Sequence, residues 1–443
     1  MIPSLRIRYV GLGSFGLLLT ALACMLLTGD ASRASAGAPP QITARQASNG
    51  PSQPQYRLLG WNDLGMHCYN PDFSTLAVLP PYNTLWAQVV RVGDPPQLVT
   101  SGITVTYVFT RNTYSAGKTN FWDYAQQIFG VQLQPNVGLK GKGLSGTMDL
   151  TGDHFQATGI PLTEFTDDNL VDRAPFQLAT ITVLDAATGL TLTQNTVVAP
   201  VSSELSCANC HSQDGDASSR YPISPTESVD ANILKIHDYL SLDQYPAGHQ
   251  GSLLAPGRGP VLCAECHASN ALGAPGVAGV KSLSNAMHGH HNRADITDIT
   301  PDTDGCYQCH PGPATKCLRD TMSQKLGMSC LSCHGNLLKV SQNPNPWANE
   351  PRCDSAGCHG GSVKLTAPLY RNSVGHAQIY CAGCHDSPHA IARSREANDG
   401  IKFVNLQGHT GTLEECTTCH ATEPGEFVHG ATWRSYFPAT WKR

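Results

Sequence analysis

The sequence predicts two regions of different fold class: an all-β, sandwich-like region over residues 56–200 and a mainly irregular and α-helical region over residues 201–443. Runs of β-branched and aromatic residues fill the first region, which holds a single cysteine. The second region consists of short polar, Gly-rich and Pro-rich segments punctuated by cysteine pairs. Because it lacks the apolar periodicity of a protein-only core, we expect a non-protein component to fill its interior.

An export signal is predicted ahead of both regions. Two arginines precede an apolar run over residues 10–27, and small residues in an A-x-A pattern end at Ala36, which indicates a signal peptide over residues 1–36. The apolar run approaches spanning length, so an uncleaved membrane anchor is the alternative, and a lipoprotein site at Cys24 is another. Residues 37–55 are rich in Pro, Gly, Ser and Gln and predict a flexible linker.

Charge and hydropathy limit the classes of function. The 443-residue chain has a formal net charge of −5, which becomes −7 without residues 1–36 because that segment carries three Arg and one Asp. This charge gives no reason to expect nucleic acid as a partner. No second long apolar segment follows. We therefore expect an exported protein of the periplasm or cell exterior, with no stable membrane span after signal cleavage and with its cysteines oxidised or capped.

Strands are predicted at four runs in the first region, residues 84–92, 98–110, 176–185 and 190–200. The last two flank "AATG", which predicts a hairpin, and the spacing of turn residues suits an antiparallel sandwich. One short helix is predicted at "FWDYAQQIF", residues 121–129.

Six cysteine pairs in the second region follow the pattern C-x-x-C-H, which is the attachment signature of c-type haem. Two thiols add across the vinyl groups on one edge of the porphyrin, and the adjacent imidazole becomes an axial ligand of the iron. Zinc ribbons also use C-x-x-C pairs, but they do not need a histidine after every pair. The cysteines are Cys207, Cys210, Cys263, Cys266, Cys306, Cys309, Cys330, Cys333, Cys381, Cys384, Cys416 and Cys419, and the proximal histidines are His211, His267, His310, His334, His385 and His420.

A seventh site is predicted at "CDSAGCH", which keeps Cys358 and His359 and places the other thiol at Cys353. The longer loop can still deliver both sulfur atoms, and the site falls in the rhythm of the others, between His334 and His385. The alternative, a disulfide or a pair of free thiols, would leave a haem-sized gap in a region with little else to form a core. We therefore expect seven haem c groups.

Distal ligands are predicted among the eleven remaining histidines of 18, nine of which follow residue 200. "NAMHGHH" places three within four residues, and His237 lies on a helical pattern in "ANILKIHDYL". His389 follows His385 by four residues, so we expect the two to share a helix face and His389 to ligate a neighbouring haem. The predicted distal ligands are His237, His249, His288, His291, His376, His389, His409 and His429.

The remaining histidines and cysteines include further side chains that can ligate a haem iron or form a disulfide. His154, in "TGDHFQ", is expected to be an ordinary surface residue, whereas His67, or its neighbour Met66, is an alternative haem ligand from the first region. Cys68 and Cys317 remain once the signal and the attachment sites are set aside. We expect a disulfide between them, because exported proteins rarely leave free thiols. The alternative is that Cys317 is a thiolate ligand of a haem iron.

With its seven sites, the segment from Cys207 to about His429 resembles the multihaem c-type cytochromes of bacteria that respire with periplasmic or extracellular acceptors. The resemblance implies low-spin, bis-histidine haems in a continuous chain, attached by an export-coupled machinery. The C-x-x-C-K site of pentahaem nitrite reductases is absent from the sequence, and seven sites fall short of the eight in hydroxylamine oxidoreductase-like enzymes.

We therefore expect an electron carrier rather than an enzyme, with redox proteins or extracellular acceptors as partners. Bis-imidazole ligation fills both axial positions of the iron, so electrons pass and substrate does not bind. A homo-oligomer or filament, whose stacked subunits continue the haem row, is a variant of this hypothesis. The alternative is an oxidoreductase acting on a small nitrogen or sulfur oxyanion at one open or Cys317-ligated haem. A haem store or scaffold is a third hypothesis, but it would not need closely spaced sites.

Overall fold

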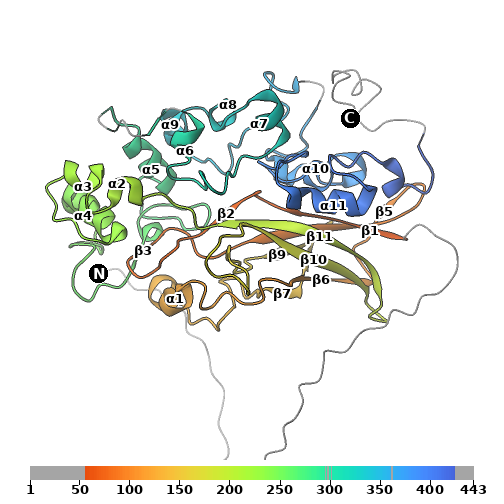
Figure 1. Ribbon diagram of the computed structural model, residues 1–443, viewed down its shortest axis with the longest axis horizontal. Coiled ribbons are helices and arrows are strands. Elements are labelled where there is room, and N and C mark those ends of the chain that lie inside the picture. Colours follow the sequence, from red (N-terminus) through yellow and green to blue (C-terminus); the bar gives the residue numbers. More distant parts are fainter. Residues whose placement is uncertain (1–54, 295, 297–298, 301, 361–362, 425–443) are drawn as a thin grey trace, which may run out of the picture. The chain divides into compact units, whose positions relative to one another are not determined.

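The computed structural model describes residues 55–294, 296, 299–300, 302–360 and 363–424 (Figure 1). The predicted signal peptide with Cys24, the linker up to residue 54, and His429 lie outside these ranges. The described residues all belong to one compact unit, Ser52–Arg443. Contacts between the β-rich and the cysteine-rich segments are therefore contacts within this unit.

Two five-stranded sheets form the first part of the described chain (Figure 1). The first sheet has the order β1-β4-β9-β8, with β5 also paired to β4, and consists of β1 (Tyr56–Asn62), β4 (Thr84–Arg91), β5 (Gln97–Leu98), β8 (Asp149–Thr151) and β9 (His154–Thr158). The second has the order β2-β11-β10-β6-β7 and consists of β2 (His67–Cys68), β6 (Ile103–Phe109), β7 (Ser145–Thr147), β10 (Phe176–Asp185) and β11 (Thr191–Ser202). Paired strands are antiparallel, except that β2 runs parallel to β11.

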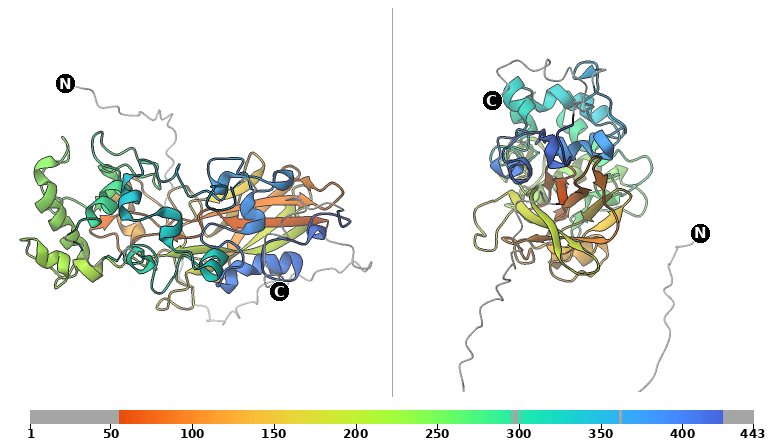
Figure 2. Two further views of the ribbon diagram at one scale, coloured as in Figure 1. Left: turned by 90° about the horizontal axis from the view of Figure 1, so that it is seen from above. Right: turned by 90° about the vertical axis from the view of Figure 1, so that its right-hand side faces the viewer.

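The sheets share one hydrophobic core and curl like half of a barrel (Figure 2). Along β10, buried residues alternate with partly exposed ones from Gln177 to Val183, which is the period of a strand with one buried face. Leu58 of the first sheet packs in this core with Tyr107 and Ile181 of the second. The structure thus confirms a sheet-rich first region with helices after it.

The predicted helix and hairpin are both confirmed. Helix α1 spans Phe121–Phe129, the nine residues of the predicted segment, and buries Phe121, Ala125 and Ile128 on one face. It ends at Gly130, whose φ of 70° is a left-handed conformation that glycine adopts readily. Strands β10 and β11 pair around the "AATG" turn.

After β11 the chain forms short helices joined by irregular segments, and one two-residue strand, β12 (Val261–Leu262), which pairs with β3 (Leu76–Ala77). The helices are α2 (Ala208–His211), α3 (Asp216–Arg220), α4 (Val229–Ser241), α5 (Leu283–His291), α6 (Thr303–Cys306), α7 (Thr321–Leu326), α8 (Cys330–His334), α9 (Leu337–Gln342), α10 (Cys381–His385) and α11 (Ala397–Gln407). The predicted helix around His237 is α4, and it begins at Ser228, whose side chain accepts a hydrogen bond from a backbone N–H of the first turn. Within the described residues, no helix combines the length and the apolar character needed to cross a bilayer.

Buried ion pairs join the late segments to one another, and α10 contacts β1 while α11 contacts β11 (Figure 1). Arg319 and Asp399 form a two-pronged pair at 2.7 and 3.0 Å, and Lys402 pairs with Asp386 at 2.9 Å. All four side chains are at most 2% exposed. The two cations also reach the β-rich region: Arg319 Nη1 donates to the carbonyl of Gly65 in the β1–β2 loop at 3.0 Å, and Lys402 Nζ donates to a backbone carbonyl of β1 at 3.1 Å. The segment before α7 and helix α11 are therefore both held directly by the β-rich region.

Candidate haem-binding sites

Each C-x-x-C-H segment forms one helical turn that closes on its first cysteine. The backbone N–H of His211 donates to the carbonyl of Cys207 at 2.9 Å, and the sites that begin at Cys263, Cys306 and Cys416 close in the same way at 3.0 Å. In α8 and α10 the whole motif is helical. This turn keeps the two thiols and the imidazole together, as attachment to one porphyrin edge and its iron requires.

The longer segment that begins at Cys353 closes a comparable turn. The N–H of His359 donates to the carbonyl of Cys353 at 3.1 Å, although the two residues are six apart instead of four. The N–H of Cys358 donates to the carbonyl of Ser355 at 2.9 Å within the loop. The two extra residues thus leave the hydrogen bond between the histidine and the first cysteine in place, which favours a seventh attachment site.

Five proximal histidines face a second imidazole at a nearly constant distance. The ring centroids are 6.0 Å apart for His288 and His310 and for His376 and His420, 6.1 Å for His237 and His267, 6.2 Å for His334 and His389, and 6.5 Å for His211 and His291. A metal between two imidazoles, at about 2 Å per metal–nitrogen bond, places the ring centroids roughly 6 Å apart. Each pair therefore has the spacing to hold one metal ion between its rings.

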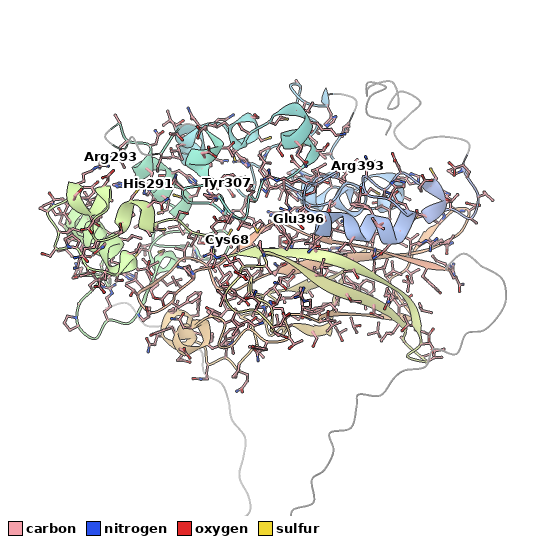
Figure 3. The ribbon with its side chains drawn as sticks, in the orientation of Figure 1. Cys68, His291, Arg293, Tyr307, Arg393 and Glu396 are labelled. Carbon is pink, nitrogen blue, oxygen red and sulfur yellow. The ribbon has the colours of Figure 1, made fainter. Side chains whose placement is uncertain are left out.

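Helix α5 carries distal candidates for two sites. His288 faces His310. His291, the last residue of α5, is labelled in Figure 3 and faces His211 of α2. Residues three apart share a helix face, so one helix can serve the first and third sites together. The ring of His290 lies 5.4 Å from that of His291. The prediction of distal ligands in "NAMHGHH" is thus matched by two imidazole pairs.

Hydrogen bonds hold the Nδ1 atoms of several of these rings. Their partners are the carbonyls of Ser284 for His288 (2.8 Å), Met287 for His291 (2.7 Å) and Lys281 for His267 (2.7 Å), the hydroxyl of Tyr245 for His237 (2.8 Å), and Asp94 Oδ1 for His420 (3.2 Å). A backbone carbonyl can only accept a hydrogen bond, so Nδ1 carries the proton in the rings that face one. The lone pair of Nε2 is then left for a metal ion, as in most histidine–metal sites.

Burial keeps several of these imidazoles neutral. Burial, followed by the charges of neighbouring histidines, lowers the pKa of His211, His310 and His334 to about 4. Burial also lowers the pKa of His237 and His288. Because metal binding requires the neutral imidazole, these side chains are in the ligand form at neutral pH.

His389 reaches His334 from a loop. The predicted helix face shared with His385 is wrong, because α10 ends at His385 and Asp386 turns the chain with a φ of 75°. His389 itself has a φ of 64°, an uncommon conformation for a residue with a side chain. The pairing of His389 with His334 agrees with the expectation that His389 serves a site other than its own.

A cavity of about 1580 Å³ joins the last four attachment sites. Among the residues that line it are Cys330, Cys333, His334, Cys353, Cys358, His359, Cys381, Cys384, His385, Cys416, Cys419 and His420, with the distal candidates His376 and His389. Its apolar wall includes Leu59, Val90, Ile379 and Leu413. Sites for drug-sized ligands measure roughly 300–1,000 Å³, so this cavity has room for more than one large group. Its donor set and its size fit several porphyrins attached side by side.

Neighbouring thiols connect the sites into a row. Besides burial and other causes, the pKa of a thiol in one site is influenced by a thiol of the next: Cys207 acts on Cys309, Cys330 on Cys306, Cys358 on Cys333, Cys381 on Cys353, and Cys419 on Cys384. These electrostatic influences link the first, third, fourth, fifth, sixth and seventh sites in turn. After burial, Asp230 helps to raise the pKa of both Cys207 and Cys263, which brings the second site beside the first.

The predicted disulfide is not formed, since Cys68 and Cys317 are both free thiols. Cys68 lies on β2, where the second sheet meets the later segments (Figure 3). Cys317 Sγ lies 3.7 Å from Nδ1 of His389, so it faces the ring nitrogen opposite the one left for a metal. Burial raises the pKa of Cys317 to about 11. Cys317 is therefore a neutral thiol against a distal candidate, and its geometry does not favour a thiolate ligand.

Two histidines of the β-rich region are buried. His67 Nε2 lies 2.9 Å from Asp63 Oδ1, and its ring stacks on Tyr82 at 6.1 Å, so this nitrogen is engaged within the first region. The prediction that His154 is a surface residue is wrong: its ring is 5% exposed and stacks on Trp86 with the centroids 4.4 Å apart. The sequence around His154 gives no sign of this aromatic partner.

Two predicted distal ligands lie away from the proximal imidazoles. His409 Nε2 lies 3.5 Å from Glu415 Oε1, and its Nδ1 lies 3.1 Å from the carbonyl of Thr410. His249 is partly exposed in the loop after α4. Within the described ranges, neither ring stacks with a proximal histidine.

The donor atoms are arranged as pairs rather than as a multidentate cage. In the part of the chain that the structure describes, no group of three or more His, Cys, Asp or Glu side chains is poised around a single ion. Comparison with protein-family models, curated proteins and solved structures found no match for this chain. Function is therefore inferred from the chemistry of these sites.

Proposed function

We propose that this chain is an exported multihaem c-type cytochrome that binds seven haem c groups and relays electrons to periplasmic or extracellular acceptors. The observation that carries the proposal is the set of five imidazole pairs, each joining a C-x-x-C-H histidine to a second histidine at 6.0–6.5 Å. A structural cysteine framework has no need for a second imidazole at that distance.

The side chains of the protein have three tasks in this proposal. When bound, haem supplies an iron atom that changes its charge by one electron. Five imidazole pairs would hold an iron from both sides, and the Nδ1 hydrogen bonds keep several of these rings in place. The apolar wall around Leu59 and Ile379 would keep water away from the bound groups. At the paired sites these side chains would permit electron transfer and leave no coordination position for a substrate.

The order of the sites suits a relay. The electrostatic influences among the sites give the order second, first, third, fourth, fifth, sixth and seventh site, which supports a relay between neighbouring sites. Thioether formation also caps fourteen thiols in an oxidising compartment. Partners would be a redox donor at one end and an acceptor protein or extracellular acceptor at the other, and a filament would extend the row from one subunit to the next.

An oxidoreductase with one open or thiolate-ligated iron is the competing proposal. Cys317 was the sequence feature that favoured it. Its sulfur lies 3.7 Å from Nδ1 of His389, which suits a hydrogen-bond acceptor for a distal ligand. The electron carrier is therefore the function that the geometry supports best.

The purified, exported protein is expected to contain seven covalently bound haems, all low-spin when oxidised. Five proximal histidines face a second imidazole, and the carrier requires a second axial ligand at His359 and His385 as well. Intact mass and pyridine haemochrome absorbance count the haems, and low-temperature electron paramagnetic resonance gives their spin states. A chain without covalent haem would overturn the proposal. A high-spin or thiolate-type signal near one per chain would replace the carrier with the oxidoreductase.

Replacing both Cys353 and Cys358 with Ala is expected to remove one haem, leaving six, because this longer motif holds its own porphyrin. Intact mass measures the loss directly. The matched control is Cys68→Ala, which removes a thiol outside the seven motifs and should keep all seven haems. An unchanged haem count in the double variant would show that "CDSAGCH" is not an attachment site.

A further inference from the structure

The proximal imidazole of the seventh site has a carboxylate partner. Nδ1 of His420 lies 3.2 Å from a carboxylate oxygen of Asp94, whereas Nδ1 of His267 faces the backbone carbonyl of Lys281. Asp94 comes from the segment between β4 and β5, 326 positions earlier in the chain. A residue of the β-rich region thus touches an axial ligand candidate of the cysteine-rich region.

Several hydrogen bonds hold this contact in place. The N–H of Gly93 donates to the carbonyl of Cys419 at 3.2 Å, and Gly93 and His420 form a parallel β-bridge. The hydroxyl of Thr422 donates to Asp94 Oδ2 at 2.7 Å, which leaves Oδ1 for the imidazole. The side chain of His420 is 18% exposed and that of Asp94 is 38% exposed. One oxygen of the carboxylate is therefore held by Thr422, and the other lies beside the imidazole of His420.

A carboxylate acts on an axial imidazole differently from a carbonyl. It accepts a charge-assisted hydrogen bond from Nδ1–H, shifts electron density onto the ring, and makes Nε2 a stronger donor to the metal. A stronger donor favours the ferric over the ferrous state. The negative charge itself acts in the same direction.

We infer that Asp94 is a positioning residue that lowers the reduction potential of the haem at His420 and makes this site the low-potential end of the row, where electrons enter. The inference rests on the proposed function. It gives the β-rich region a part in setting a potential, in addition to supporting the loops.

One positive charge, that of Arg57, opposes the effect of Asp94 near the site. Arg57 Nε donates to the carbonyl of Thr418 at 2.7 Å, and its positive charge favours the ferrous state. Arg57 acts through space, whereas Asp94 acts through the ligand. Glu414, Glu415 and Glu423 line the cavity beside Cys416 and add negative charge on the same side. The balance of charge around the seventh site therefore favours a low potential.

The test is Asp94→Asn, which keeps an oxygen acceptor for Nδ1 and removes the charge. Asp185→Asn is the matched control, because Asp185 also accepts from a threonine hydroxyl, at 2.8 Å, but sits at the end of β10 away from the haem sites. Asp94→Glu tests rescue by a variant that keeps the charge. Each variant is titrated by spectroelectrochemistry, and its haem count and paramagnetic resonance spectrum are recorded.

In Asp94→Asn we expect the lowest of the seven components to move to higher potential by at least about 59 mV, a tenfold change in its oxidised-to-reduced ratio. One low-spin signal should change its g-values, the haem count should stay at seven, and Asp185→Asn should match the wild type. Seven low-spin haems with an unchanged titration, or an equal shift in Asp185→Asn, would overturn the inference alone. A shift of a higher-potential component would overturn the assignment of the entry end. A wild-type protein without seven haems would instead overturn the proposed function.

Discussion

Gly65→Ala is expected to detach His389 from the iron held by His334 and to convert one low-spin haem to high-spin. Gly65 has a φ of +77°, and a Cβ atom added to it would lie 1.7 Å from the carbonyl oxygen of Pro388, the residue before His389. Two non-bonded atoms cannot approach so closely, so the loop that carries His389 must move. The loop has little freedom to do so, since Ser387 Oγ donates to the carbonyl of Asn62 at 2.6 Å.

Paramagnetic resonance of the oxidised protein measures the change in spin state, and the haem count should remain seven because Cys330 and Cys333 are untouched. The control is Gly102→Ala, at a φ of +71° with no atom within 4 Å of the added Cβ. It carries the left-handed strain of about 1–2 kcal/mol without the collision. If both variants lose the same stability and keep every haem low-spin, the contact between the β1–β2 loop and the His389 loop does not control ligation.

The contrast between these loops and the attachment motifs explains what the sequence could predict. The motifs are local: five residues fix the thiols and the proximal imidazole, and a nine-residue apolar pattern predicts the bounds of α1. The distal candidates in "NAMHGHH" lie close together on one helix, so they could be identified from the sequence. The proximal histidines that they face could not be identified in this way. His389 was placed on the wrong element because a left-handed residue, Asp386, ends α10 where the sequence shows no glycine.

The contacts between the β-rich region and the loops of the cysteine-rich region are not local. Asp94 and His420, Gln88 and Tyr380, and Asn62 and Ser387 are separated by 326, 292 and 325 positions. Their side chains are ordinary polar residues in strands and turns, with no motif of their own. The sequence therefore predicts an independent β-rich region. In the structure, this region forms hydrogen bonds with the loops that carry His389 and His420 and with the segment before α10. The absence of the predicted disulfide also reflects a non-local contact. Cys317 lies against His389 and is not bonded to Cys68, so both thiols are free.

Asp399→Ala is expected to destabilise the protein by about 3–5 kcal/mol, because it leaves the charge of Arg319 buried without its partner. Arg319 is 1% exposed, and both of its bonds to Asp399 are 3.0 Å or shorter. A loss of this size is about a fifth or more of the free energy of unfolding of an ordinary domain. Urea unfolding followed by far-ultraviolet circular dichroism measures it.

Two further variants separate the pair from its surroundings. Asp168→Ala breaks an exposed pair with Arg111, whose side chains are 72% and 68% exposed, and should change the stability by less than about 1 kcal/mol. Combining Asp399→Ala with Arg319→Met removes both charges and should recover part of the loss. Recovery would be incomplete, because Arg319 also donates to the carbonyls of Gly65 and Cys317. If Asp399→Ala cost no more than Asp168→Ala, the buried pair would not hold α11 to the segment before α7. In that case Gly65→Ala should leave His389 in place as well, so the two experiments test one mechanical connection from opposite ends.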